Sequence, residues 1–339
     1  MGSGLSVAMI TFNGERYLRE QVESILTQST LPDELVIGDD GSTDGTRSLI
    51  DQLADQSVVP IRVVGGDHVG LRLNVQRTME ACRGGVIILS DQDDVWLPGK
   101  ITAVREAFAD STVTLWFSDA EMSDESGVPR GDRLWEHVSL QAEQQAVIAG
   151  GDGLTRLIHG MTVTGATMAF RSDLCSLVLP LPTELELGDH IYLHDGWIAV
   201  MAYLMGRTAM DPVPRVRYRQ HGQQVTKSAS PRSQGAAHRM GLVPDGALSA
   251  EYARTRLVLS RLNEQDALTK CRPGDATTLL NLDTLLCART MPPGAARVGA
   301  ILRELARGNY ARFARGWRTA GGDLFLRHGI PVAPREVAG

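Results

Sequence analysis

Residues 5–89 alternate between short apolar runs and longer segments with helical spacing of apolar residues, and this alternation restricts the fold more than any other feature. The apolar runs lie at 5–10, 34–38, 61–64 and 86–89, and the helix-like segments lie at 15–28, 46–53 and 73–82. Strands separated by single helices form right-handed crossovers, so neighbouring strands run parallel and helices cover the sheet. We therefore predict an α/β fold of the nucleotide-binding type with a mainly parallel sheet.

The fourth apolar run leads into three carboxylates, within the segment VIILSDQDDVW at 86–96. Such a run is typical of a strand buried on both faces, and ligands bind at the carboxyl ends of these strands. Asp91 and Asp93 are two residues apart, so in an extended chain their side chains leave on the same side and can share one divalent cation. Asp94 then points elsewhere. The alternative is a solvated acidic turn in which Asp94 helps to start the next helix.

Two motifs that commonly bind nucleotide phosphates, GxGxxG and GxxxxGK, are absent from the sequence. If a nucleotide binds to this fold, another group has to neutralise its diphosphate. A cation held by Asp91 and Asp93 would do so. The sequence thus predicts a cation-dependent site at the end of the fourth strand.

The second half of the chain is less regular. Its pattern predicts strands at 112–117, 162–170 and 212–218, the last a short edge strand, and helices at 142–158 and 197–205. Gly165 interrupts an apolar strand, which indicates a bulge or a close approach of a ligand. Asp195 precedes the second helix, at the position of an N-cap.

A shift in composition to Ser, Pro, Gly, Ala and Arg at 228–246 predicts a mobile linker. We therefore predict a first domain at 1–227 and a helical carboxy-terminal extension at 247–339. The last helical pattern of the extension interleaves Arg297, Arg303, Arg307, Arg312, Arg315 and Arg318 with Ile301, Leu302, Leu305, Tyr310, Phe313 and Trp317. Two interpretations stay open: a basic amphipathic surface that contacts an anionic membrane, or a cap that packs on the first domain with its arginines in solvent.

The formal net charge of −6 and the pI near 5.8 give no reason to expect a nucleic-acid partner. No run approaches the roughly 18 apolar residues of a membrane span, and the amino terminus has no signal sequence. We therefore expect a cytoplasmic protein, located peripherally on the inner membrane face if the basic helices bind lipid.

Six segments, taken in order, resemble the family 2 glycosyltransferases of the GT-A fold, especially their bacterial rhamnosyltransferase-like members. The segments are SVAMITFNGERYLREQVESILTQ, LVIGDDGSTDGT, SDQDDVWLPGKI, TGATMAF, HDGWIAVMA and YRQHG, and they extend from Val7 to about Gly222. The resemblance implies a metal-dependent inverting transferase. Its donor would be a sugar linked to dTDP or UDP, with rhamnose as one candidate sugar. Its acceptor would be a hydroxyl of a cell-surface glycan, a lipid-linked saccharide or a natural product.

The resemblance also implies positions that bind the donor. These are Thr11, Asn13, Glu15, Asp40, Arg72 and Asp91. Asp40 would accept a hydrogen bond from the imide N–H of a pyrimidine, although the residues from 39 to 45 alone read equally well as an Asx-rich turn. Asn13 and Glu15 have an alternative as an ordinary loop that starts a helix. Arg72 stands one residue away from the position where the family carries its basic residue.

For metal binding and catalysis the resemblance implies Mg²⁺ or Mn²⁺ on Asp91 and Asp93, and a general base at Asp195 that removes the acceptor proton. The alternative for Asp195 is a helix cap. His221, in YRQHG, is either a further metal ligand or a structural histidine. The acceptor side would be lined by Gly165, Ala166, Thr167 and Trp197.

Two other functions fit part of the pattern. A sugar nucleotidyltransferase combines an α/β sheet, acidic metal ligands and a nucleotide, but those enzymes open with a Gly-rich loop and a basic residue where this chain has TFNGERY. A degenerate transferase could serve as a binding or assembly subunit at a membrane. Four intact aspartates, at 40, 91, 93 and 195, argue against that second alternative.

Overall fold

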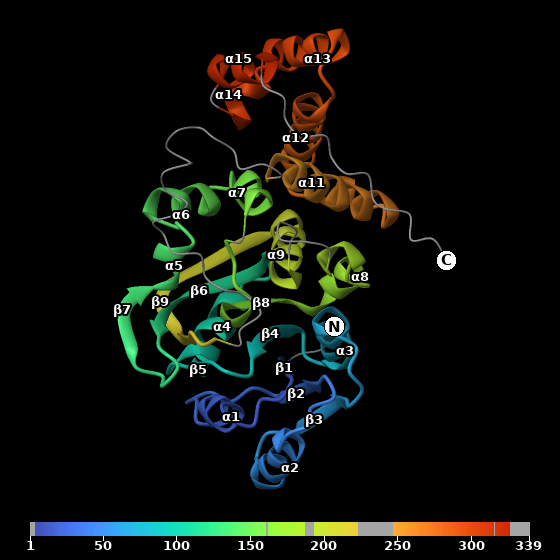
Figure 1. Cartoon of the computed structure of the whole chain (residues 1–339). Coiled ribbons are helices and arrows are strands. Elements are labelled where there is room, and N and C mark those ends of the chain that lie inside the picture. The colour runs from blue at the N-terminus through green and yellow to red at the C-terminus, as the bar shows by residue number, and fades with distance from the viewer. Residues whose placement is uncertain (1–3, 161, 187–192, 223–246, 315, 326–339) are drawn as a thin grey trace. The chain divides into compact units, whose positions relative to one another are not determined.

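The computed structural model of the chain describes residues 4–160, 162–186, 193–222, 247–314 and 316–325 (Figure 1). The chain divides into two compact units, one comprising residues 1–187 with 192–231 and the other 188–191 with 232–339. The predicted linker at 228–246 lies outside the described residues.

The first unit alternates strands and helices in its amino-terminal half, as the sequence pattern predicts. These elements are β1 (Leu5–Thr11), α1 (Leu18–Leu26), β2 (Glu34–Asp39), α2 (Thr46–Gln56), β3 (Ile61–Gly65), α3 (Leu71–Ala81), β4 (Val86–Asp91), β5 (Val95–Trp96), α4 (Lys100–Phe108) and β6 (Val113–Ser123). The remainder comprises β7 (Pro129–Arg133), α5 (Leu134–His137), α6 (Ala142–Ala149), α7 (Leu154–His159), β8 (Met168–Arg171), α8 (Cys175–Val178), α9 (His194–Met205) and β9 (Arg207–Arg219). Three 3₁₀ turns lie at Gly165–Thr167, Ser172–Leu174 and Thr183–Glu186.

The strands form one mixed sheet in the order β3-β2-β1-β4-β8-β6-β9-β5, with β7 paired to β6. The first four strands are parallel, which agrees with the predicted crossovers. The remainder departs from the mainly parallel prediction, because β8 runs antiparallel to both β4 and β6, and β5 runs antiparallel to β9. The predicted edge strand at 212–218 is wrong: β9 lies between β6 and β5. Ion pairs such as Arg215–Asp211, at 2.7 Å, accompany its charged residues inside the sheet.

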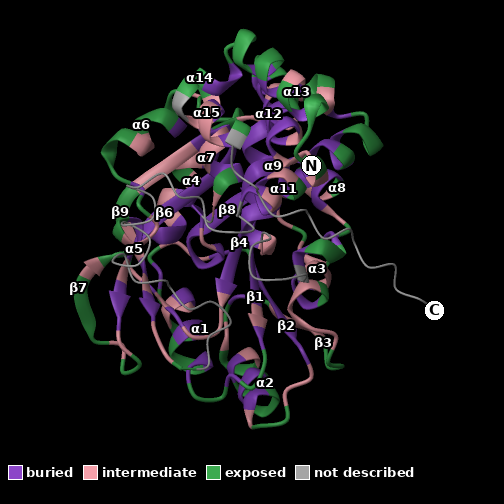
Figure 2. Ribbon diagram, turned by 45° about the horizontal axis from the view of Figure 1, so that its top comes forward, coloured by how far each residue is buried: buried purple, intermediate pink, exposed green. Residues whose placement is uncertain are grey.

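The three central parallel strands are buried on both faces. Val7 of β1 pairs in register with Leu35 of β2 and Ile88 of β4, and all three side chains are fully buried. Val22 and Ile25 of α1 pack into the same core. Figure 2 shows these strands in purple, the colour of buried residues. The apolar runs therefore form the buried strands that the sequence predicts, with both faces of the sheet covered.

These strands also end at one level. Thr11 lies beside Asp39 in the register of β1 and β2, and Ile10 lies beside Asp91 in the register of β1 and β4. The residues that follow each strand therefore meet at the carboxyl edge of the sheet, where ligands bind in open α/β folds.

Glycines break two helices that the apolar spacing predicts as continuous. The segment 142–158 forms α6 and α7, separated by a turn in which Gly151 has φ +95°. The segment 295–320 forms α13 (Ala295–Ala306), α14 (Asn309–Phe313) and the start of α15 (Trp317–Phe325), with Gly308 and Gly316 at positive φ between them. A positive φ is incompatible with a helix and readily available to glycine.

The second unit consists of helices. Before α13 it contains α11 (Ala247–Glu264), a 3₁₀ turn at Leu268–Lys270 and α12 (Asp275–Thr290). Leu285, Ile301, Tyr310 and Ala320 form its buried core, from α12, α13, α14 and α15. In the part of the chain that the structure describes, none of the helices is both long and apolar enough to cross a membrane.

Candidate active site

The acidic end of β4 is tied to the loop after β1 by Gln92, the residue between Asp91 and Asp93. The amide oxygen of Gln92 accepts hydrogen bonds from Thr11 Oγ1 at 2.5 Å and from the backbone N–H of Phe12 at 2.9 Å. Its amide nitrogen donates to the Phe12 carbonyl at 3.2 Å. Thr11, which was predicted to contact the sugar donor, is thus buried and hydrogen-bonded to Gln92. The sequence analysis did not identify Gln92, because it considered only the carboxylates of this segment.

His221 lies against the acidic segment, as its predicted role near the metal requires. Its Nε2 is 2.7 Å from Oδ2 of Asp93, and its side chain is only 6% exposed. The His221 ring stacks on Tyr17 with a centroid distance of 5.0 Å. Arg219 donates from Nε to the Asp93 carbonyl at 2.8 Å and from its backbone N–H to Asp94 at 3.0 Å. The end of β9 therefore holds Asp93 and Asp94 in place.

Asp94 and Lys100 form a buried layer beneath this segment. Lys100 is fully buried, its Nζ lies 3.9 Å from the centre of the Trp96 ring, and it donates to the Ala166 carbonyl at 2.7 Å. Burial lowers the pKa of Lys100 to about 7, against the charges of Asp94 and Asp91. Among the described residues, Oδ2 of Asp94 is buried without a hydrogen-bond partner. Asp94 therefore faces a different direction from the predicted metal pair.

The carboxylates repel one another. Burial, followed by the charges of Asp93 and Asp195, raises the pKa of Asp91 to about 7, against the opposing charge of Lys100. Burial, followed by the charges of Asp93 and Asp91, raises the pKa of Asp94 well above its ordinary value. A cluster of oxygen ligands with excess negative charge suits a hard divalent cation such as Mg²⁺ or Mn²⁺.

The three-ligand set predicted from Asp91, Asp93 and His221 is not preassembled. Within the described ranges, no three His, Cys, Asp or Glu side chains are arranged to hold one metal ion together. The imidazole of His221 instead occupies a lone pair of Asp93. The His221 contact therefore differs from a preformed site with three protein ligands. In nucleotide enzymes Mg²⁺ is commonly bound in another way, through one or two carboxylates together with substrate phosphates. The residues present fit that second arrangement.

Asp195 belongs to the same site although it is far from β4 in sequence. It lies in the first turn of α9, where its Oδ2 accepts from the Gly165 N–H at 3.0 Å and its Oδ1 accepts from the Gly196 N–H at 2.7 Å. Its charge contributes to the raised pKa of Asp91, which places the two carboxylates near each other. Two backbone donors thus set the direction of this carboxylate.

Gly165 makes the close approach that its place in an apolar segment predicts, but to protein rather than to a ligand. A Cβ at this position would lie 3.3 Å from Nε2 of His194 and 3.6 Å from Cβ of Asp195. The segment is a 3₁₀ turn, and β8 begins only at Met168. The strand predicted at 162–170 is therefore shorter, because this turn bends the backbone toward Asp195.

The predicted acceptor residues are buried. Trp197 is 0% exposed and its indole N–H donates to the Val178 carbonyl at 3.0 Å. Ala166 and Thr167 are each 1% exposed, and Gly165 is buried as well. In this structure the turn Gly165–Thr167 supports Asp195 and Lys100 through the Gly165 N–H and the Ala166 carbonyl, and the acceptor role of these residues stays a prediction.

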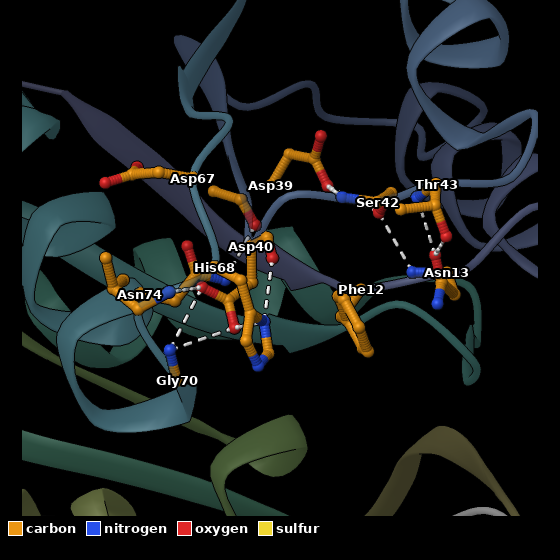
Figure 3. A network of polar contacts seen from close by, with 12 residues as sticks. Phe12, Asn13, Asp39, Asp40, Ser42, Thr43, Asp67, His68, Gly70 and Asn74 are labelled. Atoms are coloured by element: carbon orange, nitrogen blue, oxygen red, sulfur yellow. Dashed lines mark hydrogen bonds and ion pairs between the residues drawn. The ribbon is translucent and has the colours of Figure 1, made fainter.

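Asp40 is already surrounded by protein partners, as Figure 3 shows. Its carboxylate accepts from the Val69 N–H at 2.8 Å and the Gly70 N–H at 3.1 Å, and it pairs with His68 Nδ1 at 3.0 Å. The Asp40 side chain is 5% exposed and the His68 side chain is 65% exposed. The His68 ring lies 4.9 Å from the ring of Phe12. A pyrimidine that approaches Asp40 as predicted therefore has to displace His68.

Asp39, its neighbour in sequence, points to the opposite loop (Figure 3). Its Oδ1 accepts from the backbone and side chain of Ser42, which is the Asx turn that the sequence allowed. Asn13 accepts from the Thr43 N–H at 2.8 Å, and Glu15 accepts from the Gly45 N–H at 3.0 Å. Both residues brace the loop after β2, in line with their interpretation as structural loop residues.

Arg72, the remaining predicted donor contact, is directed toward the segment after α8. Its Nη1 donates to the Leu181 carbonyl at 3.1 Å. Arg77, one turn later in α3, is the arginine that approaches Asp40, at 3.5 Å.

Comparison with known proteins gives three informative matches. Residues 6–171 match the family described as Glycosyl transferase family 2. An uncharacterized glycosyltransferase from Nostoc sp. is 36% identical over 109 residues, which are 32% of this chain and 34% of that protein. The dTDP-rhamnosyl transferase RfbG of Shigella flexneri is 26% identical over 223 residues, which are 63% of this chain and 71% of RfbG.

Among solved structures, residues 1–349 of S. aureus TarS, in complex with UDP-GlcNAc, share the fold with a TM-score of 0.50 at 15% identity. The superposition covers 94% of this chain and 90% of that one. The sequence matches are shorter: this chain spans about a third or less of the length of the first curated relatives that it matches.

Proposed function

Because this chain belongs to glycosyl transferase family 2, we propose that it transfers a sugar from a nucleoside diphosphate sugar to an acceptor hydroxyl, with inversion at the anomeric carbon. One observation carries this proposal. Asp91, from β4, lines one small cavity together with His194, the residue before Asp195 in α9, and the charge of Asp195 raises the pKa of Asp91. A general base and a cation-binding carboxylate at one sheet edge are what a metal-dependent inverting transfer needs.

Asp91 and Asp93 would hold Mg²⁺ or Mn²⁺ against the donor diphosphate. When bound, such a cation stabilises the negative charge that accumulates on the departing nucleoside diphosphate. His221 and Arg219 fix the position of Asp93 through its side chain and its carbonyl. His221 is thereby a positioning residue in this proposal. It could bind the metal only if its contact with Asp93 were broken.

Asp195 would act as the base. Its carboxylate takes the proton of the acceptor hydroxyl as that oxygen forms a bond to the anomeric carbon. The bond from that carbon to the diphosphate oxygen breaks on the opposite side, so the configuration inverts. The N–H groups of Gly165 and Gly196 hold the carboxylate in one orientation during this step.

The donor would carry a pyrimidine, as dTDP or UDP. The name of RfbG states a dTDP-rhamnosyl donor, and TarS was solved with UDP-GlcNAc. Rhamnose is accordingly the first sugar to test. A lipid-linked saccharide is the first acceptor to test, since a further relative is named as a glucosyltransferase acting on a diphosphoundecaprenol-linked sugar. An enzyme with such an acceptor would work in the cytoplasm at the inner face of the membrane.

The direct test compares Asp195→Asn with the parent protein in a panel of nucleotide sugars with Mn²⁺. We expect transfer to fall by about 100-fold or more, while the thermal shift caused by donor and Mn²⁺ stays unchanged. Asp173→Asn, at an exposed aspartate after β8, is the matched control. Near-normal turnover by a folded Asp195→Asn protein would remove Asp195 as the base. Release of pyrophosphate rather than nucleoside diphosphate would favour the nucleotidyltransferase alternative.

A further inference from the structure

Helix α13 in the second unit has two apolar faces, of which only one is used for packing. Ile301 is fully buried in the core of the unit, and Arg297 and Glu304 lie on the same buried face. Val298, Leu302 and Leu305 recur at the spacing of one helical face, and they are 41%, 53% and 38% exposed. The residues of α13 that pack into the core of the second unit are therefore different from those that are exposed to solvent.

A further exposed apolar side chain, Trp317, lies on α15, the helix that contacts α13. It opens α15 and is 74% exposed, a high value for the largest apolar side chain. The four other tryptophans of the chain, at 96, 116, 135 and 197, are each 5% exposed or less. We call Val298, Leu302, Leu305 and Trp317 the outer apolar surface. Figure 2 shows the exposed residues of these helices in green.

The charges around the outer apolar surface have one sign. Between residues 295 and 325, every charged side chain that the structure describes as exposed is an arginine: Arg303, Arg307 and Arg312. The two carboxylates of this segment are buried. Glu304 is paired with Arg307 at 2.7 Å, and Asp323 is paired with Arg289 at 2.9 Å. The exposed surface is thus apolar and cationic, although the chain as a whole carries a formal charge of −6.

We propose that the outer apolar surface of α13 and α15 docks on an anionic lipid bilayer. Apolar side chains at helical spacing bordered by arginines are the pattern of helices that lie in the interface plane, with leucine and tryptophan in the acyl boundary and arginine at the phosphates. A neutral apolar partner would supply no counter-charge for Arg303 and Arg312, whereas Arg307 already pairs with Glu304. No described helix is suited to cross the membrane, so the contact is peripheral. No residue of the proposed active site belongs to this surface. A negative result for membrane binding would therefore not bear on the proposed reaction.

The test uses the full chain and vesicles of phosphatidylglycerol and phosphatidylcholine in equal parts, with pure phosphatidylcholine vesicles as comparison. Because Trp317 is the exposed tryptophan among five, its fluorescence should shift to the blue and become protected from acrylamide when the mixed vesicles are added. Trp317→Phe should lose that change and still co-sediment. High salt, near 1 M, should release the protein, because the Debye length is then about 3 Å.

Three variants locate the contact. Leu302→Ser with Leu305→Ser should lower the partition coefficient by about tenfold or more, and Arg303→Gln should lower it about fivefold. Val58→Ser, at an apolar residue that is 84% exposed in the first unit, is the control and should bind as the parent does. Since all the changed side chains are exposed, the melting temperature should stay unchanged. Absent co-sedimentation, or equal binding to both vesicle types, would overturn the proposal. Acrylamide protection that appears with protein concentration alone, without vesicles, would overturn it in favour of a second copy of the chain.

Discussion

The two acidic motifs of the first unit, at 39–40 and at 91–94, look similar in sequence and differ in what surrounds them. Asp39 and Asp40 are covered by protein donors: Ser42 on one side, and His68, Val69 and Gly70 on the other. At 91–94, His221 contacts Asp93 and the Arg219 N–H binds Asp94, but the charges of the three carboxylates still act on one another, and the pKa of Asp91 rises to about 7.

The two motifs therefore differ more in the hydrogen-bond donors around their carboxylates than in the number of carboxylates. A motif whose oxygens already accept hydrogen bonds stabilises its own loops. A motif whose charges are left to repel each other gains most from a bound cation. The comparison predicts opposite responses of the two motifs to substitution.

The largest contrast should be in activity. Asp93→Asn should reduce sugar transfer by about 100-fold or more, because the donor diphosphate loses its cation site, and it should leave the protein folded. Steady-state release of nucleoside diphosphate measures this. Asp51→Asn, on the exposed face of α2, is the control. Retention of more than about a tenth of the activity would mean that Asp93 serves His221 and Arg219 rather than a metal.

The second contrast should be in the pH dependence of stability. An unfolded aspartate ionises near pH 3.9, whereas Asp91 in the folded, metal-free protein ionises at about pH 7. Between these values the folded state keeps a proton that the unfolded state has released, so the contribution of Asp91 to stability falls as pH rises from about 4 to about 7.

Without metal, Asp91→Asn should therefore be more stable than the parent at about pH 8, by an amount of order a few kcal/mol, and equally stable near pH 4. In the presence of UDP or dTDP, Mg²⁺ should raise the melting temperature of the parent more at about pH 8 than at about pH 5, because at the lower pH it has to displace the proton. A difference in stability between variant and parent that is independent of pH would contradict the raised pKa.

The third contrast lies in the other motif. Asp40→Asn should destabilise the first unit by about 1–3 kcal/mol, because it replaces one of the two carboxylate oxygens that accept from the Val69 and Gly70 N–H groups with an NH₂ group. Urea unfolding measures this, and the affinity for Mn²⁺ should be unchanged. If Asp40→Asn were neutral in stability and weakened only donor binding, Asp40 would be a base-recognition residue, as the family resemblance implies.

The smallest effect should come from His68→Ala. The His68 side chain is 65% exposed, so stability should change by less than about 0.5 kcal/mol. The KM for the donor should stay unchanged if Asp40 only stabilises its loops, and it should fall about twofold to fivefold if the base binds at Asp40, because the base then no longer displaces a side chain from Asp40. A rise in KM would show instead that His68 binds the donor.

The local patterns of the sequence predict the amino-terminal half well. The four strands at 5–10, 34–38, 61–64 and 86–89 are recovered within one or two residues of their ends, because a buried strand between two helices depends on its own apolar residues. The antiparallel β8 and the interior β9 were not predicted, since their pairing depends on residues far away in the sequence. The positive φ of Gly308 and Gly316 explains why a continuous helical pattern divides into three.

For the site, the sequence groups Asp91, Asp93 and Asp195, whose charges act on one another in the structure, but it does not give their environment. The burial of Lys100 has no local signal, because it lies at the start of a helix that otherwise looks amphipathic. The place of Trp197 on the acceptor side is implied by the family resemblance alone, which carries no information on its burial. Its burial follows from the packing of α9, whose residues from Asp195 to Leu204 are all buried.

The most direct test is a titration of Mn²⁺ followed by electron paramagnetic resonance, in the presence of UDP or dTDP, on the parent, Asp91→Asn and Asp40→Asn. The free ion gives a signal that disappears on binding. We expect the parent and Asp40→Asn to bind one Mn²⁺ with similar affinity only when the nucleotide is present, and Asp91→Asn to bind none. Binding of Mn²⁺ that survives in Asp91→Asn, or that is lost in a folded Asp40→Asn, would contradict the assignment of the metal to the end of β4.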